Sequence, residues 1–200
     1  MPKIVDPEAR REEVVEAVFR VVRRDGLEQA SLRNVAEEAG LAIGSVRHYF
    51  AGHTELMVFA MQAMNERVVR RLLEHVERLE SAGDRLPVAE SMLAELLPLD
   101  ERRREEATIW LAFATAARTR PELRPHAEKS YDGLRHLVFR VLDGARRRDR
   151  LREDVDLEVE VERLCALIDG LTVHAVLHPD RMDAGTMTRV LRSHLQSLTR

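Results

Sequence analysis

Apolar residues recur at three- and four-residue spacing along most of the chain, and glycine or proline separates one periodic stretch from the next. This spacing is typical of amphipathic helices. The first stretch begins at the capping pair Asp6-Pro7 and stops near residue 25. A short second stretch starts after Ser31 and is stopped by Gly40, and a third runs over 44–50. Only a short turn separates these last two, so we expect them to cross steeply as a helix-turn-helix.

A long helix is expected from Thr54 to about residue 81, because its apolar residues keep the helical spacing. The alternating pattern of strands is missing. Five further helices are expected between breakers, over about 88–97, 101–117, 121–148, 157–177 and 184–198. The sequence therefore predicts an all-α fold of about nine helices, with a helix-turn-helix domain over 1–53 and a larger helical domain over 54–200.

The last two helices, 157–177 and 184–198, carry more apolar surface than one neighbour can cover. In the first of them, Cys165, Leu167 and Val173 widen the apolar stripe well past a single face. We expect the pair to pack against its copy in a second chain as a four-helix bundle; the alternative is packing within one chain only. The residues expected at this homodimer interface are Val161, Leu164, Ile168, Leu171, Ala175, Met187, Leu191 and Leu195.

Composition agrees with long amphipathic helices and narrows the choice of compartment. Charged residues make up 34% of the chain and aromatic residues 4%. A single cysteine, Cys165, excludes an internal disulfide and a cysteine-rich zinc site, which fits a reduced compartment. No apolar run is long enough to span a membrane, and the N-terminus turns charged at once, so a signal peptide is not supported. We expect a cytoplasmic protein.

Net charge gives no support for nucleic-acid binding. The formal net charge is −3, and residues 1–56 hold eight basic against ten acidic residues. Nucleic-acid-binding domains are usually basic. DNA binding by this chain therefore depends on where a few cations are placed.

The segment SLRNVAEEAGLAIGSVRHYFAGHTELM (31–57) carries a dense motif: a Ser cap, an Arg, an inward aliphatic-Ala pair, Ala-Gly, a turn, Gly-Ser-aliphatic, an aromatic-Phe pair and a Glu-Leu helix start. It resembles the DNA-binding signature of TetR-type regulators, and the chain length and later helices are also similar to that family. The resemblance implies a homodimeric, sequence-specific transcriptional regulator. Such a regulator is most often a repressor that a small-molecule inducer releases from a palindromic operator.

Within this motif, Val46 and Phe50 are expected to face inward and hold the second helix in place. Gly44 lets the backbone approach the duplex, and Ser45 opens the helix toward a phosphate. The alternatives are that Gly44 is only a turn residue and Arg33 only a solvated cation. The residues expected to contact double-stranded DNA are Arg33, Gly44, Ser45, Arg47, His48, Tyr49 and His53.

Two positions depart from the pattern of the resembling family. Arg47 stands where an aromatic residue is usual. The hypothesis is that Arg47 reads guanine through two hydrogen bonds in place of an apolar contact. Such a pair contributes roughly 1–3 kcal/mol of discrimination against the wrong base. His53 stands where lysine is usual. A histidine that is mostly neutral at pH 7 is a weaker phosphate anchor, so the hypothesis is that DNA affinity depends on pH.

Aromatic and polar side chains of the larger domain are candidates for an inducer pocket, because the resembling regulators bind small molecules there. The alternative is that apolar residues at helical spacing only fill a core. The pocket candidates are Met92, Trp110, Phe113, Tyr131, Phe139 and His174. The region from Trp110 onward also resembles the choline-responsive subgroup of these regulators. Choline is not assigned, since one Trp and two Tyr do not locate the aromatic cage that such a cation favours.

Motifs of catalysis are missing from the sequence. It has no Ser/His/Asp arrangement in a credible context, no HExxH, no GxGxxG and no Walker loop. We expect no enzyme, no metal site and no cofactor. Two other interpretations stay open: a DNA-binding regulator that takes no ligand, and a helical interaction module that does not bind DNA, which the acidic balance of the N-terminal residues favours.

Overall fold

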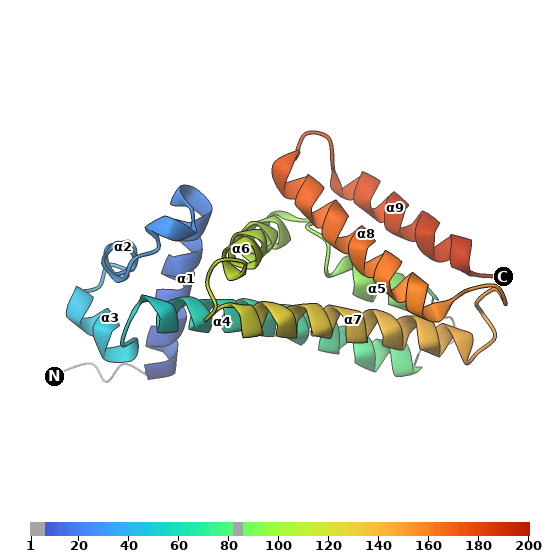
Figure 1. Cartoon of the computed structure of the whole chain (residues 1–200), viewed down its shortest axis with the longest axis horizontal. Helices are drawn as coiled ribbons and strands as arrows, with labels where there is room; N and C mark the ends of the chain where they lie inside the picture. Colours follow the sequence, from blue (N-terminus) through green and yellow to red (C-terminus); the bar gives the residue numbers. More distant parts are fainter. Residues whose placement is uncertain (1–6, 82–85) are drawn as a thin grey trace. The chain divides into compact units, whose positions relative to one another are not determined.

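The computed structural model describes residues 7–81 and 86–200, and within these ranges the chain is built from helices (Figure 1). Its described residues form one isolated bridge, Leu151 to Thr199, and no named strand. The expected all-α fold is confirmed, with nine α-helices in the described ranges. The elements are α1 (Pro7–Asp25), η1 (Leu27–Gln29), α2 (Leu32–Glu38), α3 (Ile43–Tyr49), α4 (His53–Ser81), α5 (Leu86–Ala94), α6 (Glu101–Ala117), α7 (Arg124–Arg146), α8 (Leu157–Leu177) and α9 (Ala184–Leu198).

Side-chain caps begin several helices where the sequence predicts them. Ser31 Oγ accepts the Asn34 N–H at 3.2 Å at the start of α2. The carboxylates of Asp100 and Asp156 accept backbone N–H groups at the starts of α6 and α8 in the same way. Each cap satisfies a donor that helix geometry leaves unpaired. Asp6, expected to cap α1, lies outside the described residues.

Turns account for the places where helix boundaries differ from the prediction. The short helix η1 is unpredicted: Gly26, at φ +88, separates it from α1, and its single turn buries Leu27. At two places a turn stands where a helix end was expected. There the backbone N–H groups bond the carbonyl three residues back, and not four as in an α-helix. α5 consequently ends at Ala94 rather than near residue 97, and α7 starts at Arg124 rather than at Pro121.

The chain divides into two compact units, and each is described by itself. The first comprises Met1–Glu66 and Thr108–Ala127, of which residues 7–66 and 108–127 are described. Its core joins Val18 of α1, Val35 of α2, Leu56 of α4 and Phe113 of α6. The helix-turn-helix expected over 1–53 therefore does not pack alone, because the start of α4 and the segment 108–127 complete its core.

The second unit comprises Arg67–Ala107 and Glu128–Arg200. α8 and α9 pack there against residues of α5 and α7, including Leu93 and Val138. The eight residues expected at a dimer interface are all in this core and at most 6% exposed: Val161, Leu164, Ile168, Leu171, Ala175, Met187, Leu191 and Leu195. This corrects the expected interface, because the stripe with the most apolar residues packs within the chain. A dimer through α8 has to use another face.

Candidate DNA-binding surface

The second helix of the motif, α3, rests on a small buried face. Val46 is 0% exposed and Phe50, just after the helix, is 1% exposed. The ring of Phe50 packs against Phe59 of α4 with centroids 5.4 Å apart, and the Arg11 guanidinium of α1 lies 6.0 and 5.5 Å from the two ring centroids. Such cation–π contacts add to apolar packing. Because a helix this short is not stable alone, its neighbours hold α3 in place.

The turns at both ends of α3 have specific chemistry. Gly40 has φ +66, the left-handed region that suits glycine, and the next N–H, of Leu41, bonds the Ala36 carbonyl at 2.9 Å. After α3, Glu55 Oε2 accepts the Ala51 N–H at 2.7 Å and closes the turn into α4. The helix-turn-helix predicted from sequence is thus present, with Gly40 ending its first helix.

An ion-pair clamp connects α1 to the end of α2. The Glu38 carboxylate accepts hydrogen bonds from the guanidinium groups of Arg20 and Arg24, each at 2.7 Å. These bonds, Arg20 first, lower the pKa of the Glu38 carboxyl below its usual value. Both arginines are thereby occupied within the protein, which reduces the positive charge that this unit offers to other molecules.

The outward face of α3 presents side chains that can donate hydrogen bonds. A Cβ placed on Gly44 meets nothing within 4 Å, and Gly44 is not among the residues with positive φ. Neither the backbone nor the packing therefore requires glycine there, which favours close approach of another molecule over a role in the turn. Of the residues expected to contact DNA, those exposed on α2 and α3 are Arg33, Gly44, Ser45, Arg47 and His48, and Tyr49 is half-buried.

A hollow of about 400 Å³ opens beside this face. Its lining residues are Arg10, Leu41, Gly44, Ser45, His48 and Tyr49. The rings of His48 and Tyr49 meet edge to face, with centroids 5.2 Å apart. Sequence reasoning missed Arg10, because only the packing of α1 against α3 brings this residue to the motif.

His53, the first residue of α4, is half-buried beside a charged pair. Arg120 donates two hydrogen bonds to the Glu28 carboxylate, at 2.8 and 2.7 Å. Burial, and secondly the charge of Arg120, lowers the pKa of His53 below its usual 6.5, while Glu28 and Glu122 act in the opposite direction. His53 is therefore mostly neutral at pH 7. Any pH dependence that it gives to DNA binding is expected at a more acidic pH than for an unperturbed histidine.

The six candidates for an inducer pocket are divided between the two units. Phe113 is 0% exposed and belongs to the core of the first unit, where Trp110 packs against the same core. In the second unit, Met92 is 3% exposed, whereas Tyr131, Phe139 and His174 are exposed. Tyr131 donates a hydrogen bond to Glu162 at 2.9 Å. Phe113 and Met92 are thus buried, Tyr131, Phe139 and His174 lie on a surface, and an inducer pocket formed by the six residues stays a prediction.

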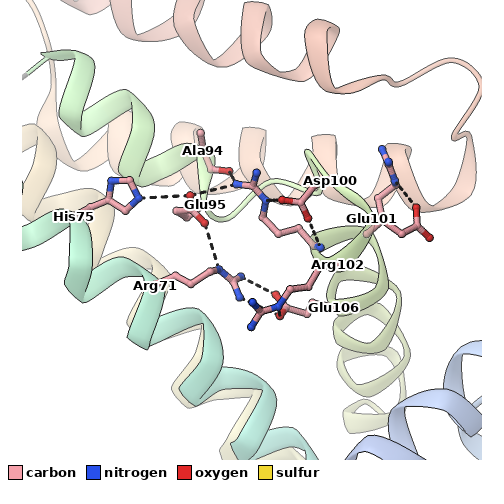
Figure 2. A network of polar contacts seen from close by, with 10 residues as sticks. Arg71, His75, Ala94, Glu95, Asp100, Glu101, Arg102 and Glu106 are labelled. Carbon is pink, nitrogen blue, oxygen red and sulfur yellow. Dashed lines mark hydrogen bonds and ion pairs between the residues drawn. The ribbon is translucent and has the colours of Figure 1, made fainter.

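Sequence reasoning also missed a polar network in the second unit, where α4, α5 and α6 come together (Figure 2). Arg71 of α4 donates two hydrogen bonds to the Glu106 carboxylate of α6, at 3.0 and 2.6 Å, and its Nε lies 3.2 Å from Glu95. His75 and Arg103 also contact Glu95, at 3.4 and 3.3 Å. Glu106 is only 7% exposed, so its charge depends on these partners.

Comparison with known proteins decides the family. Residues 86–200 match the model for the BetI-type transcriptional repressor, C-terminal region. The chain is also 37% identical over 201 residues to the HTH-type transcriptional regulator PksA of Bacillus subtilis, an alignment that covers 99% of this chain and 94% of PksA. This chain belongs to the TetR family of transcriptional regulators. As a TetR-family protein it is a helix-turn-helix transcriptional regulator and not an enzyme.

Solved structures agree with the TetR family. A transcriptional regulator from Rhodococcus sp. Rha1 is similar with a TM-score of 0.81 and 31% sequence identity, covering 94% of this chain and 95% of that chain. A regulator from Saccharomonospora viridis in complex with choline has a TM-score of 0.86 at 20% identity, covering 96% and 99%, and at that identity the likeness shows the fold alone. Among residues 7–81 and 86–200, none of the helices has the length and apolar character needed to cross a membrane.

Proposed function

We propose that two copies of this chain form a homodimer that binds a palindromic operator, represses transcription there and is released by a small-molecule inducer. The outward face of α3 carries the proposal. Ser45, Arg47 and His48 are exposed, while Val46 and Phe50 anchor the helix on a core. A helix anchored in this way can enter the major groove with its exposed side chains toward the base edges. Membership of the TetR family supports the same conclusion.

A dimer follows from the limited reach of one recognition helix. Each α3 reads only a few base pairs, and a second copy about 34–36 Å away reads the other half of a palindrome. The outer face of α8 suits the contact between copies: Val159 and Leu177 are 50% and 59% exposed, and the small residues Ala166 and Gly170 lie exposed between them. Small residues permit close approach of two helices, and the apolar ends gain by burial.

An inducer is proposed because TetR-family regulators bind small molecules and one structural neighbour is in complex with choline. Choline is therefore the first compound to test. A ligand changes DNA affinity only if it binds the DNA-competent arrangement and the alternative arrangement unequally. A protein that binds chromosomal DNA works in the compartment that holds the DNA, which supports the expected cytoplasmic location.

A second candidate function is a helical interaction module without DNA binding. The observation in its favour is that Arg20, Arg24 and Arg120 of the first unit pair with Glu38 and Glu28. These pairs reduce the positive charge that the described part of the unit offers to phosphates. The weaker the cationic surface, the smaller the sequence-independent part of DNA affinity.

A gel-shift titration over a range of salt concentrations separates the two functions. The duplex is the DNA upstream of the chain's own gene, and the variants are Arg47→Ala and Arg118→Ala, the second being an exposed arginine of the same unit that lies outside the helix-turn-helix. We expect retardation that weakens as salt rises and that falls much further for Arg47→Ala. No retardation at low salt favours the interaction module. Loss of retardation on adding choline identifies the inducer.

A further inference from the structure

One arginine outside the helix-turn-helix lines the hollow beside α3. Arg10 lies in the first turn of α1, and Figure 1 shows α1 grouped with α2, α3 and the first turns of α4. The side chain of Arg10 is 22% exposed, and its Nη1 lies 2.7 Å from Glu13 Oε2. The opposite wall of the hollow is α3, through Gly44, Ser45, His48 and Tyr49. Two helices that are distant in the sequence thus line one depression.

The chemistry of the lining suits an anion. Its polar side chains are a guanidinium, two hydroxyls and an imidazole, all of which can donate hydrogen bonds, and no carboxylate is part of the lining. Glu13, the partner of Arg10, is 55% exposed. Charge-assisted bonds from arginine to a phosphate are among the strongest that such a surface can form. Gly44 also lines the hollow, and its missing side chain leaves room for a phosphate group.

We infer that this hollow holds one backbone phosphate of the operator in each half-site, with Arg10 as its main cation. The inference rests on the proposed function and adds a contact from α1, outside the helix-turn-helix. When α3 lies in the major groove, the walls beside it face the sugar-phosphate backbone, where contacts fix position and carry no sequence information directly. Arg10 is therefore a positioning contact, and Arg47 remains the candidate for base readout.

Glu13 competes with the phosphate for Arg10. The pair joins residues three positions apart on a helix and its acidic partner is largely exposed, so it is weak, and a phosphate that accepts bonds from several donors can displace Glu13. The two residues consequently have opposite effects: loss of Arg10 weakens DNA binding, and loss of the Glu13 charge strengthens it. A purely structural Arg10–Glu13 pair predicts instead that the two substitutions act in the same direction.

The test compares Arg10→Gln, Arg10→Lys and Glu13→Gln in the full-length protein on a duplex that the wild type binds. For Arg10→Gln we expect about tenfold weaker binding at low salt and a plot of log K against log salt that is shallower by about 0.9 per protomer. Arg10→Lys keeps the charge and retains the wild-type slope, and Glu13→Gln binds more tightly than the wild type. The order of preference among operator variants stays unchanged in all three.

The matched control is Arg118→Gln, which removes an exposed arginine elsewhere in the same unit. Equal losses for Arg10→Gln and Arg118→Gln overturn the inference, because they indicate a general effect of net charge. A changed base preference in Arg10→Gln, or weaker binding by Glu13→Gln, overturns it as well. If the wild type binds no duplex, the proposed function fails; if the wild type binds and Arg10→Gln matches it, only the phosphate site fails. Circular dichroism of each variant checks that α1 stays folded.

Discussion

α3 and α8 are both helices with apolar residues, but they distribute burial in opposite ways. α3 buries only Val46 of its seven residues, whereas α8 buries nine of its 21. α3 is held by Phe50, Phe59 and Arg11 around it, and its side chains remain available for binding. α8 is held by its own inner face. A binding helix can therefore keep an open surface when one buried residue of its own, here Val46, and the side chains of neighbouring elements hold it in place.

The outer face of α8 gives the largest expected effect. Ala166→Glu places a charge opposite its symmetry-related copy in the proposed dimer, and like charges at an interface cost several kcal/mol. We expect a monomer that no longer binds the palindrome, while its helix content is unchanged. Sedimentation velocity measures the oligomeric state, with Ser193→Glu on the exposed side of α9 as the control. A dimeric Ala166→Glu protein shows that the copies meet elsewhere.

A substitution on the inner face of α8 is expected to lower the stability of the fold. Leu164 is 0% exposed, so Leu164→Ala removes buried methyl groups and leaves a cavity. We expect the free energy of unfolding to fall by about 2–5 kcal/mol, with no change in operator preference at temperatures where the variant is folded. Urea unfolding followed by circular dichroism provides the measurement. A loss of less than 1 kcal/mol would indicate that this face is not a core.

A substitution on the outer face of α3 is expected to change the sequence specificity of DNA binding. Arg47→Ala removes an exposed side chain and a candidate guanine contact, so we expect about 1–3 kcal/mol less discrimination between operator and mutated operator. Urea unfolding of the variant should match that of the wild type, because Arg47 is exposed. Competition binding with single-base operator variants measures the effect. Unchanged preference assigns base readout to another residue.

The clamp that positions α2 is expected to have a smaller effect. In Glu38→Gln the hydrogen bonds from Arg20 and Arg24 lose their charged acceptor, so the thermal midpoint falls slightly, and more at low than at high salt. Because the folded-state pKa of Glu38 is lowered, its contribution is present above the unfolded value near 4.5 and is lost as pH falls through the folded value. Melting curves of both proteins should therefore converge in acid. A difference that persists at pH 3 contradicts this origin.

The smallest expected effect concerns His53 at the junction of α3 and α4. Burial and Arg120 keep its pKa below 6.5, so the imidazole is neutral between pH 7 and 8 and His53→Gln should bind DNA as the wild type does in that range. As pH falls through the lowered pKa of His53, the wild type gains a charge near the duplex and should bind relatively more tightly. Fluorescence anisotropy at pH 5.5, 7 and 8 checks this. The control His48→Gln shows whether the other histidine of the motif causes the pH dependence instead.

Local patterns were enough to predict the nine α-helices and the motif, though not the short helix η1 or every helix end. Ser31 caps α2, Gly40 ends it, and the spacing of Val46 and Phe50 places both on the buried side of α3, as the sequence indicates. These features depend on residues within a few positions of one another. The helix-turn-helix could therefore be derived without the structure, whereas the half-burial of Tyr49 and His53 could not.

Contacts between distant segments could not be derived in this way. α8 carries apolar residues on more than one face, so periodicity alone could not show that Leu164 lies inside and Val159 outside. Arg10 reaches the hollow beside α3 only because α1 packs there. The hydrogen bond from Arg71 to Glu106 joins α4 to α6 between residues 35 positions apart in the sequence, and no sequence pattern predicts it.

Selection of bound sequences from a pool of random duplexes tests the central claim most directly. The full-length protein is incubated with the pool at moderate salt, and the retained duplexes are sequenced and then titrated to determine the number of chains bound. The account predicts a palindrome with half-site centres about one helical turn apart, roughly 10–10.5 base pairs or a multiple of it, bound by chains in pairs. A pool that remains random, or a site without two-fold symmetry bound by a single chain, would contradict it.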